Sequence, residues 1–356
     1  MIKINKNIKI ANTLPGHLYN SEEFLNKCKK KIFESTWQFT IDEKKIKEEE
    51  IIPIQYIENY IDEPLIITKK NGIKCMSNVC THRGNILIEK KTNFKKKIIC
   101  NYHGRQFDEN GKMTFMPKCS ELKNFPSQND HLTKIPCKQW KQFIFNSLNP
   151  KYNLNEYFKD METRVGWMPI EKFKYSKKMS CEYLVKANWA LYCDNYLEGF
   201  HIPFVHEDLS KAIDMTQYKT EIFKLSNLQI GFSDNPKECF KLPKNSPEYG
   251  LNVAAYYFWI FPNIMFNFYP WGLSINIVKP QKVDLTKIEY HTYIWDESKL
   301  NIGAGGDVGK VEKEDQEIIE RVQKGTKSRY YKHGRYSPSM EQGTHHFHTL
   351  ISDFLK

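Results

Sequence analysis

The chain has 356 residues, of which 40% are hydrophobic and 27% charged, and its formal net charge is +11. That length is enough for two domains with separate hydrophobic cores. The charge comes from lysines spread along the whole sequence, which favours a solvated surface over a nucleic-acid interface. No apolar run is long enough to span a membrane, and the N-terminus lacks the apolar core of a secretion signal, so we expect a cytoplasmic protein.

The nine cysteines are scattered along the chain. An odd number without regular spacing is not a disulfide framework. We therefore expect most of them to be free thiols in a reducing compartment, and a special role only for cysteines with metal-binding neighbours.

Residues 1–37 predict a short helical segment. Ser21 is followed by Glu22 and Glu23, the pattern of a capping residue with acids in the first helical turn. We expect this helix to continue to about Phe33 and the segment to pack on the second domain.

Residues 38–150 predict a small β domain. The expected strands are short and lie at 51–54, 65–67, 73–76 and 98–99. Asn71-Gly72 and Asn110-Gly111 are strong turn signals between them. Such a domain presents loops at one end, as a metal clamp requires.

Two of these loops carry metal-ligand pairs. Cys80 and His82 form the first pair, and Cys100 and His103 form the second, with seventeen residues between the pairs. Two thiolates and two imidazoles suit a structural zinc ion. They also suit a [2Fe-2S] cluster with the thiolates on one iron and the imidazoles on the other. A zinc finger would continue into a helix, whereas residues 104–112 predict a strand and a tight turn, which favours the cluster.

Residues 151–356 show a different pattern of expected helices and strands. We interpret 151–180 as a connector, followed by a helix and a long mixed segment. Aromatic-rich strands are expected at 254–261, 264–269, 273–278 and 288–295, and a last helix is expected from about Lys313. The pattern predicts a sheet with flanking helices.

The segment 188–206 predicts a buried helix with polar groups on one face. Asp194, Glu198 and His201 follow one another at steps of four and three. Buried carboxylates and imidazoles are costly unless they are paired or bound to metal. Pro203 must end or bend the helix, so His206 arrives from beyond the bend and can meet His201 on one ion.

A third ligand is expected on the last helix. Its apolar stripe consists of Ile318, Ile319 and Val322. At about 100° per residue Asp315 lies near the centre of that stripe, whereas Glu314, Glu317 and Glu320 are expected to be solvated. Two imidazoles and a carboxylate form the facial triad of non-haem Fe(II) oxygenases. The alternative is that Asp315 only favours the helix dipole, and periodicity does not separate the two.

The motifs together carry a family resemblance. Arg83-Gly84, Tyr102 and Gly104 around the two loops resemble the Rieske iron–sulfur motif. From Leu14-Pro15 to the last helix, the chain resembles the large (alpha) subunit of a Rieske-type ring-hydroxylating oxygenase. The resemblance implies an α+β fold: an all-β Rieske domain over 38–150 and a catalytic domain over 151–356. That second domain would be of the helix-grip (START/Bet v1-like) type, with an antiparallel sheet.

The resemblance also implies the site residues and partners. His201, His206 and Asp315 would hold a mononuclear iron, with Glu198, Asn195 and Asp194 in catalytic roles. Glu198 would bridge to a Rieske histidine of a neighbouring subunit, which implies a homotrimer. A separate flavin- or ferredoxin-type reductase would supply electrons, and the basic surface could attract an acidic donor. Oxygen and a small molecule would be the substrates.

The expected substrate class follows from the particular residues found in these motifs. Glu198 in Asp-Asn-Tyr-Leu-Glu and the tail from Gly334 resemble the branch acting on choline, glycine betaine and carnitine. The alternatives are an aromatic ring-hydroxylating dioxygenase, a Rieske electron-transfer or redox-sensing protein, and a zinc-bound structural module. Aromatic residues over 256–271 either line a pocket or pack a core, and Trp271 is the best single candidate for a pocket wall.

Three histidines near the C-terminus leave a further alternative open. His345, His346 and His348 suggest either a third metal site or structural hydrogen bonds in a terminal element, and the second interpretation is favoured.

Overall fold

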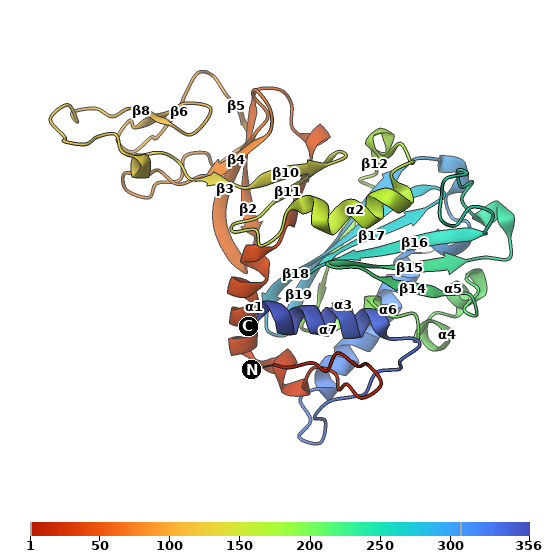
Figure 1. The fold of residues 1–356 in the computed structure, drawn as a ribbon. Coiled ribbons are helices and arrows are strands. Elements are labelled where there is room, and N and C mark those ends of the chain that lie inside the picture. Colours follow the sequence, from red (N-terminus) through yellow and green to blue (C-terminus); the bar gives the residue numbers. More distant parts are fainter. Residues whose placement is uncertain (1, 307) are drawn as a thin grey trace. The chain divides into compact units, whose positions relative to one another are not determined.

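The computed structural model describes residues 2–306 and 308–356 (Figure 1). Its internal contacts divide the chain into two units. One unit comprises residues 34–151, and the other joins residues 1–33 to residues 152–356. The N-terminal segment therefore belongs with the C-terminal part of the chain.

The 34–151 unit consists of short antiparallel strands. Three sheets have the strand orders β1-β11-β10, β5-β2-β3-β4-β9 and β6-β7-β8. The strands are β1 (Gln38–Asp42), β2 (Glu50–Ile57), β3 (Ile61–Thr68), β4 (Lys74–Ser77), β5 (Thr92–Asn93), β6 (Ile98–Ile99), β7 (Gln106–Phe107), β8 (Met113–Phe115), β9 (Lys134–Ile135), β10 (Cys137–Trp140) and β11 (Phe143–Asn146). The β domain predicted from the alternation of strands and turns is confirmed.

The turns of this unit position the two ligand loops. Asn71 and Gly72 have φ angles of 53° and 93° between β3 and β4, the left-handed backbone of a tight hairpin turn. The first ligand loop follows β4, and the second lies between β6 and β7. The two loops therefore leave different sheets of this unit, and their cysteines, Cys80 and Cys100, lie in one hydrophobic core cluster.

An antiparallel sheet forms the centre of the other unit. Its order is β12-β19-β18-β17-β16-β15-β14, and β13 also pairs with β19. The strands are β12 (Lys174–Tyr175), β13 (Cys181–Val185), β14 (Lys219–Ile222), β15 (Ser226–Phe232), β16 (Val253–Ile260), β17 (Ile264–Tyr269), β18 (Gly272–Lys282) and β19 (Leu285–Ile294). The last four agree with the strands expected from the aromatic-rich runs.

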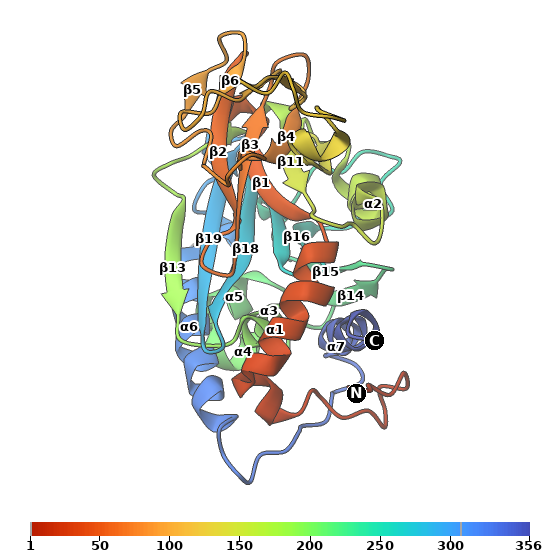
Figure 2. The ribbon, with the colours of Figure 1, turned by 90° about the vertical axis from the view of Figure 1, so that its left-hand side faces the viewer.

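Helices accompany this sheet (Figure 2). They are α1 (Glu22–Lys31), α2 (Leu154–Val165), α3 (Trp189–Tyr196), α4 (Ile202–Val205), α5 (Glu207–Ala212), α6 (Val308–Gly325) and α7 (Gln342–Phe354). Helix α3 contacts strand β18 and both long C-terminal helices, α6 and α7. It is therefore the element through which the sheet and the C-terminal helices meet.

Two predictions about helix positions are wrong. The segment 151–180, expected to be a connector, contains helix α2. A capping box formed by Asn153 and Glu156 stabilises the start of this helix. The last long helix expected from Lys313 is α6, which begins at Val308. Glu312, which precedes the expected start, is therefore helical as well.

The helix expected over 188–206 is also shorter than predicted. Helix α3 ends at Tyr196, several residues before His201, so Asp194, Glu198 and His201 do not share one helical face. Pro203 does not end a helix but lies in the first turn of α4. A proline fits there because the first N–H groups of a helix have no intrahelical acceptor.

The N-terminal segment is tied to α3 and α7 by polar and aromatic contacts. The Tyr19 hydroxyl donates to Asp194 at 2.7 Å, and His348 Nε2 lies 2.8 Å from the same carboxylate. Trp189 packs edge-on against Phe33 and Phe347, with ring centroids 4.9 and 5.6 Å apart. The start of the chain is thus part of the core of this unit.

Among the residues that the structure describes, no helix is both long and apolar enough to cross a lipid bilayer.

Candidate metal centres and cavity

The two Cys-His loops have nearly the same backbone. The N–H of Gly84 donates to the carbonyl of Cys80 at 3.0 Å, and the N–H of Gly104 donates to the carbonyl of Cys100 at 2.9 Å. Both glycines have positive φ angles, 73° and 75°, which a residue with a side chain rarely adopts. The glycine four residues after the cysteine in each loop therefore lets the loop fold back on that cysteine.

The cysteines of the two loops are buried more deeply than His103. Cys80 and Cys100 are each 2% exposed, whereas the His103 residue lies at the surface. The His82 and His103 rings lie edge to face with centroids 4.6 Å apart. The buried Nδ1 atom of His82 has no hydrogen-bond partner, as a metal-ligating nitrogen would. This donor set fits a cluster with an inner thiolate-bound iron and an outer imidazole-bound iron.

A buried arginine braces the first loop. Arg105 is 4% exposed and donates to the Thr81 hydroxyl at 2.7 Å, while the Thr81 hydroxyl donates to the carbonyl of Asp130 at 2.8 Å. The same guanidinium lies 3.3 Å from the Asp130 carboxylate. The residue that follows the second loop thus fixes the position of the first.

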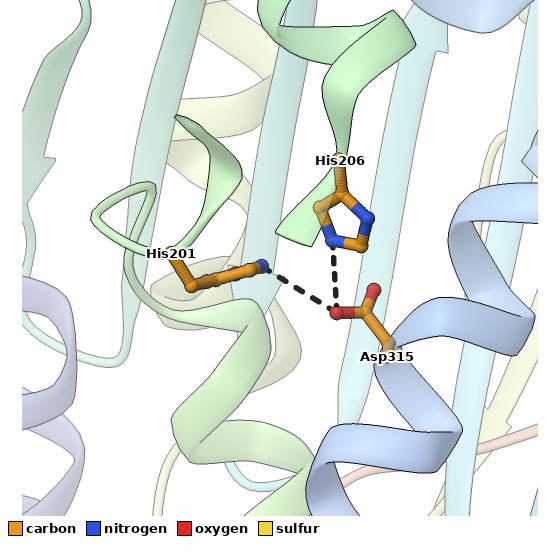
Figure 3. Close-up of side chains that lie close together, drawn as sticks. All are labelled: His201, His206 and Asp315. Carbon is orange, nitrogen blue, oxygen red and sulfur yellow. Dashed lines mark hydrogen bonds and ion pairs between the residues drawn. The ribbon is translucent and has the colours of Figure 1, made fainter. Parts of the chain in front are cut away.

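In the other unit, His201, His206 and Asp315 converge (Figure 3). Nε2 of His206 lies 3.0 Å and Nε2 of His201 lies 3.4 Å from Oδ1 of Asp315. One ligand atom from each residue lies within 4.8 Å of the others, a group that metal-ligand chemistry suits. The three side chains come from the turn after α3, the junction of α4 and α5, and α6. The open alternative for Asp315, a residue that only favours the helix dipole, does not explain why two imidazoles face it.

The Nδ1 atom of each imidazole, the nitrogen that does not face Asp315, contacts a carboxylate. Nδ1 of His201 lies 2.6 Å from Glu198, and Nδ1 of His206 lies 2.8 Å from Glu314. Such partners orient a ligating histidine and fix its tautomer. The prediction that Glu314 is a solvated residue is therefore wrong. Glu320, also expected to be solvated, accepts the backbone N–H of Lys186, whereas Glu317 is exposed as predicted.

The charges of the cluster stabilise each other. Burial acts to raise the pKa of Asp315, but hydrogen bonds with His201 and His206 outweigh burial and hold that pKa below its usual value. Burial acts to lower the pKa of His201, but Asp315 and Glu198 raise it to about 9. The site thus holds an ionised carboxylate between two imidazoles, which fits a divalent iron in the two-histidine, one-carboxylate set.

A cavity opens beside this cluster, enclosing about 700 Å³ if space open to solvent is counted. Five tyrosines form much of its wall: Tyr192, Tyr196, Tyr218, Tyr257 and Tyr269. Three carboxylates, those of Glu198, Glu312 and Asp315, also line it. Among the described residues of its lining there is no lysine or arginine. The cavity is therefore aromatic and acidic.

Glu312 is a pocket residue that the sequence did not reveal. Its carboxylate accepts hydrogen bonds from the hydroxyls of Tyr192 and Tyr290, the former at 2.9 Å, and from the Asn276 amide at 3.4 Å. Burial raises the pKa of Glu312 to about 8, while the Tyr290 hydroxyl opposes that shift. The signal that would have found it is its spacing of three residues from Asp315, which places both on one face of α6.

The other predicted site residues are divided between the cavity and the core. Asn195 lines the cavity beside Glu198. Asp194 does not line it, and faces Tyr19 and His348 instead. Trp271 is not a wall residue: it is 1% exposed and stacks behind Tyr269 with ring centroids 5.1 Å apart. That prediction is wrong, because only the outer ring of the stack reaches the cavity.

The C-terminal histidines lie on α7 and make structural contacts. His345 Nε2 lies 2.7 Å from the carbonyl of Asn5, and His348 lies 2.6 Å from the Tyr336 hydroxyl. None of these three histidines belongs to the group formed by His201, His206 and Asp315. Structural hydrogen bonds, the favoured interpretation, agree with these contacts.

The chain carries two candidate iron sites: two cysteines with two histidines, and two histidines with one carboxylate. Together these ligand sets are typical of a two-centre non-haem iron oxygenase. Comparison with protein families agrees. Residues 36–126 match the Rieske [2Fe-2S] domain, and residues 166–356 match the ring hydroxylating alpha subunit (catalytic domain). Since the second match covers more than half of the chain, the chain belongs to the family of ring-hydroxylating oxygenase alpha subunits.

Individual relatives cover nearly the whole chain. Choline monooxygenase of Beta vulgaris is 27% identical over 97% of this chain and 78% of its own length. The carnitine monooxygenase oxygenase subunit of Escherichia coli K12 is 26% identical over 97% of this chain and 94% of its own. The similarity to both therefore extends over both units of the chain.

Solved structures share the fold. The quaternary ammonium Rieske monooxygenase CntA in complex with L-carnitine has a TM-score of 0.76 and 21% identity, covering 98% of this chain and 97% of that one. Naphthalene 1,2-dioxygenase from Rhodococcus, bound to indole, has a TM-score of 0.70 and 16% identity, covering 96% and 93%. The predicted α+β architecture, a Rieske domain plus a catalytic domain with an antiparallel sheet, is confirmed.

The protein is thus an oxidoreductase of the Rieske oxygenase class, with a [2Fe-2S] cluster and a mononuclear iron as cofactors. This decides between the metals that the sequence left open, because the family match places a Rieske domain, and not a zinc finger, on the Cys-His loops. The buried unpartnered His82 nitrogen and the converging His201, His206 and Asp315 fit the two groups.

Proposed function

We propose that this chain is the terminal oxygenase that hydroxylates a quaternary ammonium compound, using O2 and electrons from a separate flavin- or ferredoxin-type reductase. The observation that carries the proposal is the cavity beside the metal-ligand cluster. Five tyrosines and three carboxylates line it, and its described residues include no lysine or arginine. Aromatic faces and carboxylates both attract a quaternary ammonium group.

Each metal centre has its proposed residues. Cys80, His82, Cys100 and His103 would hold the cluster, and His201, His206 and Asp315 would hold the iron. The two iron centres, when present, supply single-electron transfer and O2 activation. In a hydroxylation one oxygen atom enters a C–H bond and the other leaves as water, which consumes two electrons and two protons.

The protein's own groups have separate tasks in this scheme. Glu198 and Glu314 hold the two ligating imidazoles at their Nδ1 atoms. Asn195, which lines the cavity beside Glu198, is proposed to contact the substrate or the ligand side chains. For Glu198 we also propose the bridge to a Rieske histidine of a neighbouring subunit, in a homotrimer located in the cytoplasm. Asp194 would act only by holding α3 against α7.

An aromatic hydrocarbon is the second candidate substrate, since the fold is shared with naphthalene dioxygenase. The cavity argues against it, because three carboxylates and the amides of Asn195, Gln229, Asn267 and Asn276 line the wall. An apolar ring would displace solvent from these polar groups without offering them a hydrogen bond or a charge in return.

The test is a substrate panel. Iron-loaded protein, supplied with a reductase, is incubated with trimethylammonium compounds and with aromatic hydrocarbons while oxygen uptake and product are measured together. We expect coupled uptake and product only with the ammonium compounds. Coupled turnover of naphthalene, with none of any ammonium compound, would overturn the proposal.

A further inference from the structure

The cavity contains one carboxylate that neither the metal-ligand cluster nor the proposed bridge between subunits uses. Glu312 lies on α6, three residues before Asp315, and lines the cavity. Of the other two carboxylates in the wall, Asp315 faces both imidazoles and Glu198 is hydrogen bonded to His201. Glu312 is thus the carboxylate of this wall that pairs with neither ligating imidazole.

The surroundings of Glu312 are arranged to keep a carboxylate in place. Tyr192 from α3, Tyr290 from β19 and Asn276 from β18 each donate a hydrogen bond to it. Three donors from three different elements hold the group in one orientation. A glutamine would satisfy much the same donors without the cost of a charge in a desolvated wall, so a purely structural role does not explain the acid.

The tyrosines complete a site for a cation. Tyr257 and Tyr269 lie nearly perpendicular, with ring centroids 5.9 Å apart and an interplanar angle of 79°, so they form two walls of a corner. Both rings line the same cavity as Glu312. Aromatic faces at right angles suit a bulky trimethylammonium group, which has no N–H and is recognised through its charge and apolar surface.

The charge of the cavity favours some quaternary ammonium compounds over others. When Glu312 is ionised, the three carboxylates carry three negative charges, of which a divalent iron offsets two, and a monocation neutralises the third. A carboxylated ammonium such as carnitine or betaine would bring a negative charge into a wall whose described residues offer no lysine or arginine. Burying a carboxylate without a cationic partner is costly.

We propose that Glu312 is the specificity-determining group that pairs with the ammonium of the substrate, and that the site takes monocationic amino alcohols such as choline in preference to carboxylated ammonium compounds. This rests on the proposed oxidation of quaternary ammonium compounds and names the substrate class for that same cavity. Glu312 contacts the substrate through charge alone, and the chemistry stays with the metal cluster.

The experiment measures binding without turnover. Iron-loaded protein is titrated by calorimetry under anaerobic conditions with choline, with L-carnitine and with 3,3-dimethylbutan-1-ol, the uncharged carbon analogue of choline. The wild-type protein is expected to bind choline at least tenfold more tightly than either of the other two. The E312Q variant is expected to lose at least tenfold in choline affinity, about 1.4 kcal/mol, while its affinity for the alcohol stays within twofold.

The control is E317Q, which removes a carboxylate from the same helix at a side chain that is 58% exposed and outside the cavity. Its affinities should equal those of the wild type. Carnitine binding as tightly as choline, unchanged selectivity in E312Q, or binding of none of the three ligands would overturn the proposal. If E312Q fails to fold, equal wild-type affinity for choline and the alcohol still overturns it. Because no oxygen is present, selective binding without later hydroxylation would refute the proposed function and leave this role of Glu312 standing.

Discussion

Replacing Glu314 with alanine should weaken iron binding at the mononuclear site. His206 is 1% exposed at its side chain, and its Nδ1 lies 2.8 Å from Glu314. When Nε2 binds iron, the proton must stay on Nδ1, and without Glu314 that buried N–H has no carboxylate acceptor. Such a loss costs about 1–3 kcal/mol. Since the Glu314 side chain is 30% exposed, water can replace part of the interaction, so we expect the lower end, about tenfold in iron affinity.

The assay is an anaerobic titration of metal-depleted protein with Fe(II), with the visible spectrum of the Rieske cluster as the internal measure of folding. Glu314→Gln keeps a carbonyl acceptor and should lose less than the alanine variant. Glu317→Ala, the exposed neighbour on the same helix, should lose nothing. Equal iron affinity in Glu314→Ala and the wild type would refute the reasoning that the second nitrogen of His206 needs this carboxylate.

Further predictions concern the other groups. Asp315→Ala should lose the mononuclear iron and all turnover while the cluster spectrum stays intact, and retained product formation would remove Asp315 from the site. Cys80→Ser should lower the iron content from three to one per chain, measured by elemental analysis. Asp194→Asn should lose about 1.5–3 kcal/mol of unfolding free energy in urea, because its carboxylate pairs with His348, with iron affinity unchanged. Choline affinity should rise about tenfold per pH unit up to about pH 8 and level off above it, since a cation binding below the pKa of Glu312 must displace its proton. The same affinity at pH 6.5 and pH 8.5 would contradict that last prediction.

The candidate metal-ligand residues could be proposed from the sequence because most of them lie in short segments with ligand-like spacing. The Cys-His pairs each lie within one tight loop, and the glycine four residues after each cysteine adopts the left-handed backbone that the loop requires. Asp315 became a candidate because an acid in an apolar stripe needs a partner, but only the family resemblance favoured the ligand role over a helix-dipole role. The convergence of His201 and His206 was also expected, but by the wrong route: the helix ends before His201, and Pro203 starts the next one instead of ending the first.

The cavity wall could not be predicted in the same way. Strands β15 and β17 are buried along their whole length, so alternation does not tell which side chains face a cavity and which face the core. Trp271 was chosen for its neighbours in sequence, yet the ring that reaches the cavity is that of Tyr269. Glu314 was assigned to solvent from the faces of its own helix, which carry no information about an imidazole approaching from another element.

The most direct test of the central claim is a single-turnover experiment. Iron-loaded protein is reduced chemically, freed of reductant and mixed with O2 and choline, and the hydroxylated product is measured per chain. The two iron centres together hold the two electrons of one hydroxylation, so we predict product approaching one per chain and none from the Asp315→Ala variant. Oxidation of both centres in the wild type with no product formed from choline or any other trimethylammonium compound would contradict the claim.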